Sequence, residues 1–494
     1  MLARVTIGAA CAEALAFSQE NEAAALAAQT LKDWNVPGLA LAIVRDGRVV
    51  HVGGYGVRGN TGREAVTTKT LFGIGSITKS FTVLTLGTLA LEGKLDWDKP
   101  VRDYMPDFRL QDPVAAERAT ARDLVTHRTG LPRHDAMWGG GNYSRMDIYE
   151  RLRYLAPSRD FRAAFQYNNL MYMTGGILAE RIGGGPWEAL VKQRVMEKAG
   201  MRATVTTYAE AALASDRAIG HGDQATPEEI PISAVAAGID AAAPAGAIHS
   251  HIEDMARYMV MHLGDGEIEG GRVLPAPLFR EMRTPRIPCP GAAAQYPGEQ
   301  SYGMGLFLTQ YRGHSVAFHT GTYGGYHALL WMLPEQKFGV MILMNRVVRA
   351  APAALALKLT DLFLGAPATD WTASLKKAAS SDAEKTKQAA VELRQKRKDG
   401  TQPSHELAAY TGAFRNTAYG EVTVEQAGGK LTMSRNLRRA IKIEHWHYDV
   451  FAIPADGNVA PDLVRFEMND EGEIDRLHWK LEPAVSPIVF ERVR

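Results

Sequence analysis

The chain has 494 residues, of which 46% are hydrophobic and 22% are charged, and its net charge is only +1. At about 150 residues per domain, this length suggests three domains. A chain this long buries enough surface to form a core that needs neither disulfides nor metals. The near-neutral charge excludes a globally basic nucleic-acid-binding surface, and the two cysteines, Cys11 and Cys289, exclude a disulfide scaffold or a cysteine-rich zinc module. No stretch approaches the roughly 18 consecutive apolar residues of a transmembrane helix. We therefore expect a globular protein with no membrane span.

The N-terminus allows two interpretations. Arg4 precedes a short apolar stretch, and residues 14–16 (Ala-Leu-Ala) are similar to an export-signal cleavage site. Glu13 interrupts that stretch, and the segment continues into a helix-like sequence. Whether residues 1–16 are cleaved, and whether the protein is cytoplasmic or periplasmic, is left open by the sequence.

The first clear elements are two β-rich runs within residues 38–56, on either side of the hairpin-turn pair Asp46-Gly47. Three more strands are predicted within residues 314–345. We expect these five strands to form one antiparallel sheet built from both ends of a large α/β (α+β) domain.

Between these strands the sequence is mostly helical. Apolar periodicity predicts helices over residues 76–92, 170–182 and 252–263. The expected fold is therefore a sheet flanked by helices, with a mostly helical insertion over about 95–245.

The composition changes after residue 364. Residues 366–403 are charged and Ala-rich, which predicts a solvated linking helix, and residues 404–494 contain alternating hairpin patterns typical of a small β-barrel or sandwich. The predicted domains are therefore 1–365, the linker 366–403, and 404–494.

The first chemical motif is Ser76-Ile77-Thr78-Lys79. Ser76 opens an apolar helix, and Lys79 lies one turn later on the same face, within reach of the hydroxyl. A serine needs a base to become a nucleophile, and a buried lysine at a helix start loses its proton readily. The backbone N–H of Ser76 would suit an oxyanion hole. The alternative is that Ser76 is a helix cap and Lys79 a surface residue.

Tyr167-Asn168-Asn169 is the second motif. A phenol can relay a proton, and a side-chain amide can hold a substrate carbonyl and a lysine together. The alternative is a buried tyrosine followed by an N-cap asparagine.

The third motif is His319-Thr320-Gly321-Thr322, on a predicted strand. The missing side chain at Gly321 would let a substrate backbone lie against the strand. The N–H of Thr322 would then be the second oxyanion donor. The alternative is an edge strand with a partly buried histidine.

Together, the order and context of the three motifs resemble the serine β-lactamase and penicillin-binding-protein superfamily, over about residues 25–365. FGIGSITKSFT and TARDLVTHRTGLPRHD resemble the class C branch, which includes D-aminopeptidases, carboxypeptidases and family VIII esterases. The C-terminal segment resembles the lipocalin-like module of some of these peptidases.

The resemblance implies that Ser76 is the acylated nucleophile, Lys79 its base, and Tyr167 the proton relay and deacylation base. It makes Asn169 a substrate-carbonyl ligand and assigns the substrate-binding strand to 319–322. It implies no cofactor and no metal.

One departure bears on the substrate. Class C β-lactamases begin the third motif with a lysine that meets a substrate carboxylate, whereas His319 is mostly neutral at pH 7. This weakens the case for β-lactams and for peptides with a free C-terminal carboxylate. The resembling D-aminopeptidases and other peptidases carry histidine at this position, so the resemblance favours amide or peptide substrates, with esters close behind.

Other motifs in the sequence give weaker evidence of function. The glycine-rich stretch 54–59 is not followed by a helix, the basic run 394–398 is offset by nearby acids, and the histidine pairs at 249/251 and 445/447 have no visible third ligand. Trp138, beside a glycine run, is a candidate for shaping specificity.

Three functions remain in order of preference. The first is a serine hydrolase that forms an acyl-enzyme on Ser76 and cleaves amide or peptide bonds. The second is a carboxylesterase or weak β-lactamase with the same site, and the third is a non-catalytic penicillin-binding-like protein. We expect a small-molecule or peptide substrate and no nucleic-acid partner. The protein could also form a homo-oligomer.

Overall fold

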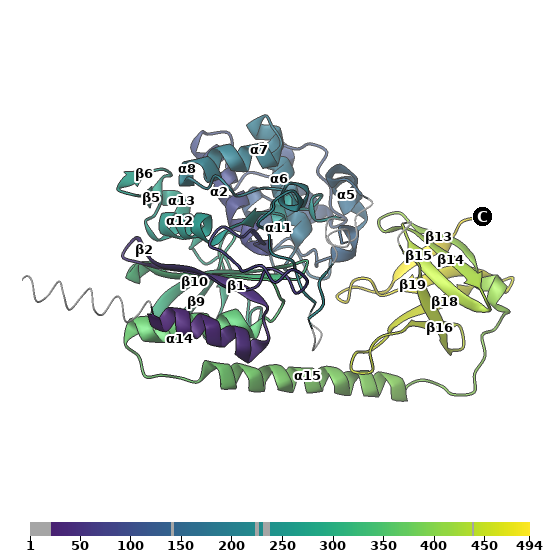
Figure 1. Cartoon of the computed structure of the whole chain (residues 1–494). Coiled ribbons are helices and arrows are strands. Elements are labelled where there is room, and N and C mark those ends of the chain that lie inside the picture. Colours follow the sequence, from purple (N-terminus) through teal and green to yellow (C-terminus); the bar gives the residue numbers. More distant parts are fainter. Residues whose placement is uncertain (1–20, 140–142, 223–226, 231–237, 437–438) are drawn as a thin grey trace, which may run out of the picture.

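The computed structural model describes residues 21–139, 143–222, 227–230, 238–436 and 439–494 (Figure 1). The possible export signal at 1–16, Cys11 and part of the glycine run after Trp138 lie outside the described residues. None of the helices in the described ranges combines the length and apolarity needed to cross a bilayer.

An eight-stranded antiparallel sheet organises the larger part of the molecule, in the order β2-β1-β12-β11-β10-β9-β8-β7. Its strands are β1 Gly38–Arg45, β2 Arg48–Gly56, β7 Ile287–Pro288, β8 Ser301–Tyr302, β9 Phe307–Tyr311, β10 His314–Tyr323, β11 Tyr326–Leu333 and β12 Phe338–Met344.

The five predicted strands are adjacent in this sheet, and they come from both ends of the domain as expected. The expected strand number was wrong, because β9, β8 and β7 extend the sheet beyond β10. Two of these strands have only two residues, and β7 contains Pro288. Such short segments carry no detectable alternation of apolar and polar residues.

The β1–β2 hairpin follows from its turn residues. Asp46 and Gly47 have φ values of +50° and +75°, the left-handed pair that a two-residue turn requires. Successive residues of β1 then point to opposite faces: Ala40 and Ala42 enter one apolar core, whereas Leu39 and Leu41 enter the other.

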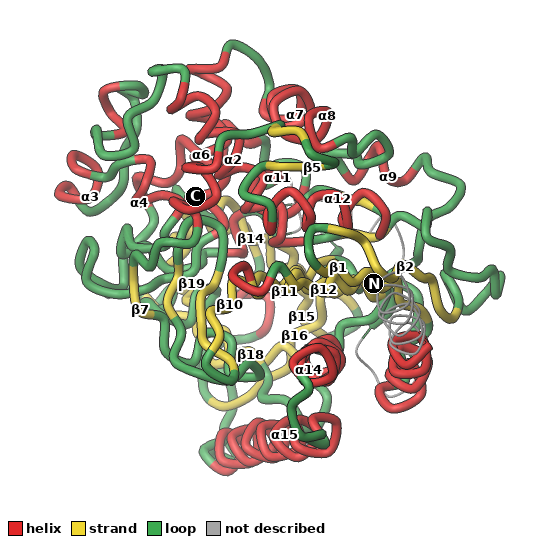
Figure 2. Tube along the Cα trace, turned by 90° about the vertical axis from the view of Figure 1, so that its left-hand side faces the viewer, coloured by secondary structure: helices red, strands yellow, loops and turns green. Residues whose placement is uncertain are grey.

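Helices cover both faces of the sheet (Figures 1 and 2). On one face lie α12 and, farther out, α2, α6 and α11; on the other lie α14 and the helical residues 21–34. The main helices are α2 Thr78–Leu91, α5 Arg145–Arg151, α6 Asn169–Gly183, α12 Ile252–Leu263, α14 Ala350–Leu364 and α15 Trp371–Gln395. The shorter helices are α3 Pro113–Arg118, α4 Ala121–Val125, α7 Trp187–Val191, α8 Glu197–Ala199, α9 Tyr208–Ala212, α11 Ala243–Gly246 and α13 Ala276–Met282.

Four two-residue strands form two separate ribbons: β3 Phe72–Gly73 with β4 His249–Ser250, and β5 Glu267–Ile268 with β6 Gly271–Arg272. The first ribbon leads directly into the predicted Ser76 motif.

The C-terminal part is a closed antiparallel barrel, which confirms the predicted β-barrel. Its strands are β13 Gly412–Asn416, β14 Gly420–Ala427, β15 Lys430–Arg435, β16 Ile441–His447, β17 Val450–Ile453, β18 Asp462–Met468, β19 Ile474–Trp479 and β20 Ile488–Arg492. In Figure 1, α15 runs alongside the larger part and leads to the barrel. The division into 1–365, 366–403 and 404–494, and the lipocalin-like character of the barrel, stay predictions.

Candidate active site

Ser76 lies in a tight turn between the β3 ribbon and α2. A single 3₁₀ turn, Gly75–Ile77, precedes α2, so Ser76 sits just before the α-helix instead of opening it. Gly75 has φ +51°, and a Cβ there would lie 2.6 Å from the backbone nitrogen of Thr322. The glycine therefore lets the turn approach β10 closely, and Ser76 remains partly exposed.

Lys79, one turn beyond, is completely buried. Its Nζ lies 2.9 Å from Oγ of Ser76, and it donates to Oδ1 of Asn169 and to the carbonyl oxygen of Ala245, each at 2.8 Å. Burial holds the pKa of Lys79 well below its ordinary value of 10.5. A neutral amine has two hydrogens for the two carbonyl-type oxygens, which leaves its lone pair for the Ser76 hydroxyl.

Asn169 begins α6, whose N-cap is Asn168. The Nδ2 of Asn169 donates to Oδ1 of Asp135 at 2.9 Å, which directs its Oδ1 toward Lys79. The same carboxylate oxygen accepts from the indole N–H of Trp138 at 2.8 Å. Asp135 thus fixes which end of the Asn169 amide faces the lysine.

The phenol of Tyr167 also reaches Ser76. Its ring lies 4.9 Å from Nζ of Lys79 and 5.0 Å from the guanidinium of Arg133. Burial raises the pKa of Tyr167 to about 12, although a hydrogen bond to Ser76 and the charge of Arg133 act in the opposite direction. Because the phenol keeps its proton at neutral pH, it is suited to relay a proton and poorly suited to act as a phenolate base.

The third motif lies on β10, as predicted. Pairing of β10 with β9 ends at Phe318, whereas pairing with β11 continues to Tyr323. The edge of residues 319–323 that does not pair with β11 therefore faces the Ser76 turn. A Cβ on Gly321 would lie 1.8 Å from the carbonyl oxygen of Ile74. The space that we expected a substrate backbone to occupy at Gly321 is therefore filled by the chain itself.

His319 is buried behind the site. Its Nε2 lies 3.1 Å from the hydroxyl of Tyr302, its Nδ1 lies 2.6 Å from the carbonyl oxygen of Thr320, and only 1% of it is exposed. Burial lowers the pKa of His319 to about 3, so the ring is neutral at pH 7.

A cavity of about 250 Å³ opens over Ser76. Asn169 and Thr322 line it, whereas His319 and Gly321 do not. Trp138 is also in its wall. Other lining residues, which the sequence motifs did not indicate, have charged, aromatic or aliphatic side chains: Arg133, Asp135, Tyr323 and Ile239. Arg133 and Asp135 lie in residues 120–135, one of the segments that resemble the family. That resemblance is the signal in the sequence that could have placed them at the site.

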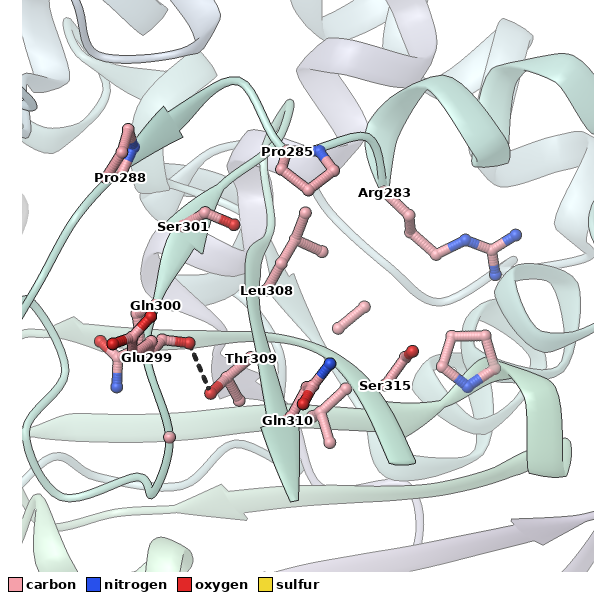
Figure 3. Close-up of a pocket in the computed structure, with 14 residues that line it drawn as sticks. Arg283, Pro285, Pro288, Glu299, Gln300, Ser301, Leu308, Thr309, Gln310 and Ser315 are labelled. Atoms are coloured by element: carbon pink, nitrogen blue, oxygen red, sulfur yellow. Dashed lines mark hydrogen bonds between the residues drawn. The ribbon is translucent and has the colours of Figure 1, made fainter. Parts of the chain in front are cut away.

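A larger cavity of about 760 Å³ lies against β8, β9 and β10, away from these residues (Figure 3). Arg283 in its wall is paired with Asp265, and the hydroxyl of Thr309 donates to the backbone carbonyls of Pro297 and Glu299. These two polar groups are thus engaged with the chain itself, whereas the smaller cavity contains Ser76 and the residues around it.

The family model described as Beta-lactamase matches residues 23–364. The chain belongs to the β-lactamase family. It is thus a member of the serine hydrolases related to β-lactamases and penicillin-binding proteins. A second model, a domain of unknown function (DUF3471), matches residues 396–492 and so includes the barrel.

Relatives of this β-lactamase-family chain include two proteins that match it over two thirds of its length or more. The unguisins hydrolase ungD of Aspergillus violaceofuscus is 28% identical over 86% of this chain and 81% of its own length. Penicillin-binding protein 4 of Amycolatopsis lactamdurans is 27% identical over 67% of this chain and 84% of its own length.

Solved structures share the fold over both parts. The octameric penicillin-binding protein homologue from Pyrococcus abyssi has a TM-score of 0.61 at 23% identity and covers 95% of this chain and 99% of its own. SurE with D-Leu has a TM-score of 0.57 at 19% identity, over 96% of this chain and 100% of its own.

Proposed function

We propose that this β-lactamase-family chain hydrolyses amide or peptide bonds through an acyl-enzyme on Ser76. The observation that carries the proposal is the buried Nζ of Lys79, 2.9 Å from Oγ of Ser76, with two oxygens accepting its hydrogens. In the first step Oγ attacks the substrate carbonyl carbon while its proton moves to Nζ.

The acyl-enzyme then forms as the carbon–nitrogen bond breaks. The proton on Nζ passes to the leaving amine, with the neutral phenol of Tyr167 as the relay. The backbone N–H groups of Ser76 and Thr322 are our proposed donors to the developing oxyanion. Water then attacks the acyl carbon while Lys79 takes one of its protons. The bond between the acyl carbon and Oγ breaks, and the same proton passes from Lys79 to Oγ, which restores the Ser76 hydroxyl and the neutral amine.

The charges at the cavity support a substrate other than a simple carboxylate-bearing β-lactam. His319 is neutral and outside the cavity wall, and the cation that does reach the wall, Arg133, is paired with Asp135. Trp138, Tyr323 and Ile239 offer an aromatic and aliphatic wall. Among the relatives, one is named a hydrolase and one structure is titled with D-Leu, so D-amino-acid amides are sensible first probes.

Ser76→Ala tests the proposal. The variant should lose turnover and covalent labelling by a fluorophosphonate probe. Ser374→Ala is the matched control, because Ser374 begins a second Ser-x-x-Lys sequence on the exposed helix α15 and should label like the wild type. Undiminished labelling of Ser76→Ala would overturn the proposal.

The same residues could instead serve a carboxylesterase. Parallel assays on p-nitrophenyl esters and D-amino-acid amides separate the two, and a strong ester preference would replace peptidase by esterase. An unlabelled, folded wild type would favour the non-catalytic binding protein. The possible homo-oligomer stays a prediction, which light scattering on the full chain tests.

A further inference from the structure

The segment that forms one wall of the cavity has an unusual backbone. We call residues 133–138 the rim segment. His134 has φ +45° and ψ +37°, a left-handed conformation at a residue that carries a side chain. Such a conformation costs about 1–2 kcal/mol and persists where surrounding contacts impose it. Arg133 and Asp135, on either side of this turn, both reach the cavity.

The contacts around His134 come largely from the barrel. The backbone N–H of His134 donates to Oε2 of Glu482 at 2.7 Å, and Oε1 of Glu482 accepts from the N–H of Ala484 at 3.0 Å. Glu482 is only 5% exposed. A buried carboxylate that lies more than 300 residues later in the chain therefore accepts a hydrogen bond from the backbone of this turn.

The ring of His134 is held on both nitrogens. Nε2 lies 2.9 Å from the carbonyl oxygen of Ala156, which can only accept, so Nε2 carries the hydrogen. Nδ1 must then accept, and the hydroxyl of the buried Tyr419 lies 2.6 Å away as its donor. Arg435 of the barrel adds a hydrogen bond of 2.7 Å to the carbonyl oxygen of Ala136.

The rim segment connects these barrel contacts to the nucleophile. Asp135, the residue after the turn, accepts from Nδ2 of Asn169, and Oδ1 of Asn169 accepts from Lys79. Lys79 in turn contacts Ser76. A shift of the turn would change the contact through which Asp135 orients the Asn169 amide.

The barrel contacts the rim segment from its outside. Its interior is filled by buried apolar side chains, among them Phe414, Phe466 and Phe490. Figure 1 shows the barrel beside the end of the larger part that carries α5.

We propose that the barrel is a positioning element of the active site, in which Tyr419 and Glu482 hold the left-handed turn at His134 and so fix Asp135 against Asn169. The inference rests on the proposed function for its catalytic consequence. Tyr419, Glu482 and His134 are positioning residues, since they act through Asp135.

The first test compares single variants of the full chain. Tyr419→Phe and Glu482→Ala should each lower the rate of fluorophosphonate labelling about tenfold. Tyr410→Phe is the matched control, because Tyr410 is also buried in the barrel but donates to Asp449, away from the rim segment. Arg394→Ala is a second control, because it removes a contact between α15 and the carbonyls of Gly457 and Val459, elsewhere on the barrel. Equal rates in the Tyr419 variant and both controls would overturn the proposal.

A double-mutant cycle shows whether the effect passes through Asp135. If it does, adding Tyr419→Phe to Asp135→Ala should change labelling by less than about twofold, although Tyr419→Phe alone lowers it tenfold. Additive losses would mean that the barrel acts by another route and would overturn the proposal.

The last measurement does not depend on catalysis. In Tyr419→Phe, amide hydrogen exchange should speed up in a peptide covering residues 131–138 and stay unchanged in α12. If the wild type is not labelled, the proposed function fails, while this exchange result still decides whether the barrel holds the rim segment. Unchanged exchange in 131–138 overturns the inference.

Discussion

Oδ1 of Asn169 accepts a hydrogen bond of 2.8 Å from Nζ of Lys79, a residue 90 positions earlier in the chain. The amide is oriented by its opposite end, because Nδ2 donates to Asp135. The amine of Lys79 is thus held by a neutral amide oxygen. The carboxylate of Asp135 bonds to the other end of that amide and not to the amine. Asn169 thus positions the lysine without a charge of its own, and Asp135, which does raise the pKa of Lys79, has a smaller effect than burial.

Asn169→Asp should therefore impair acylation. A carboxylate beside Lys79 would raise the pKa of the amine and repel Asp135, so we expect a loss of about 100-fold or more in kcat/KM at neutral pH. Asn169→Leu removes the contact without adding charge. If Asn169→Asp retained the wild-type rate, Asn169 would not determine the protonation of Lys79.

The pH dependence of labelling should report Lys79. The neutral amine is the active form, so the rate should rise as the pH passes upward through its lowered pKa. Arg133 lowers this pKa and Asp135 raises it. Arg133→Met should therefore move the rising limb to higher pH, and Asp135→Asn should move it to lower pH. Labelling rates measured from about pH 5 to about pH 10 check the pair, and shifts in the same direction would contradict it.

The sequence predicts five strands of the sheet and the closeness of Ser76 and Lys79 because their signals are local. Asp46-Gly47 determines the first hairpin, and the three-residue spacing of Ser76 and Lys79 places both groups on one turn. Long alternating or apolar runs likewise mark β10 and β12. These features need only neighbours along the chain.

The rest of the site depends on distant contacts. His134 meets Tyr419, which is 285 residues later, and no pattern in either segment announces the pairing. The close approach at Gly321 depends on the fold in the same way: a missing side chain signals it, but only the fold shows that the group facing the Cβ position is Ile74. Substrate binding along this strand stays a prediction. The burial that neutralises His319 likewise arises from packing across several strands.

Gly321→Ala should damage both folding and activity. The added Cβ would lie 1.8 Å from the carbonyl oxygen of Ile74 and 3.1 Å from the nitrogen of Ser76. We expect a loss of about 1–3 kcal/mol in the free energy of unfolding and slower labelling, because the backbone must move. Gly185→Ala is the control, since a Cβ there meets no atom within 4 Å. Equal melting temperatures for the two variants would contradict the packing of β10 against the Ser76 turn.

Buried neutral histidines should make the protein sensitive to acid. His262 is fully buried against Tyr258 and Phe279, and burial, with a smaller contribution from Arg283, lowers its pKa to about 3. Between about 3 and 6.5 the unfolded chain binds this proton and the folded chain does not, so stability falls as the pH falls. At pH 5 this amounts to about 2 kcal/mol for one histidine.

His262→Leu removes this titration and keeps an apolar side chain in the core. The loss of unfolding free energy between about pH 7 and about pH 5, measured by urea denaturation, should be smaller by about 2 kcal/mol than in the wild type. Phe279→Leu perturbs the same packing without removing a titratable group, so its pH dependence should match the wild type. If His262→Leu lost as much stability on acidification as Phe279→Leu, the neutral His262 would not contribute to acid sensitivity.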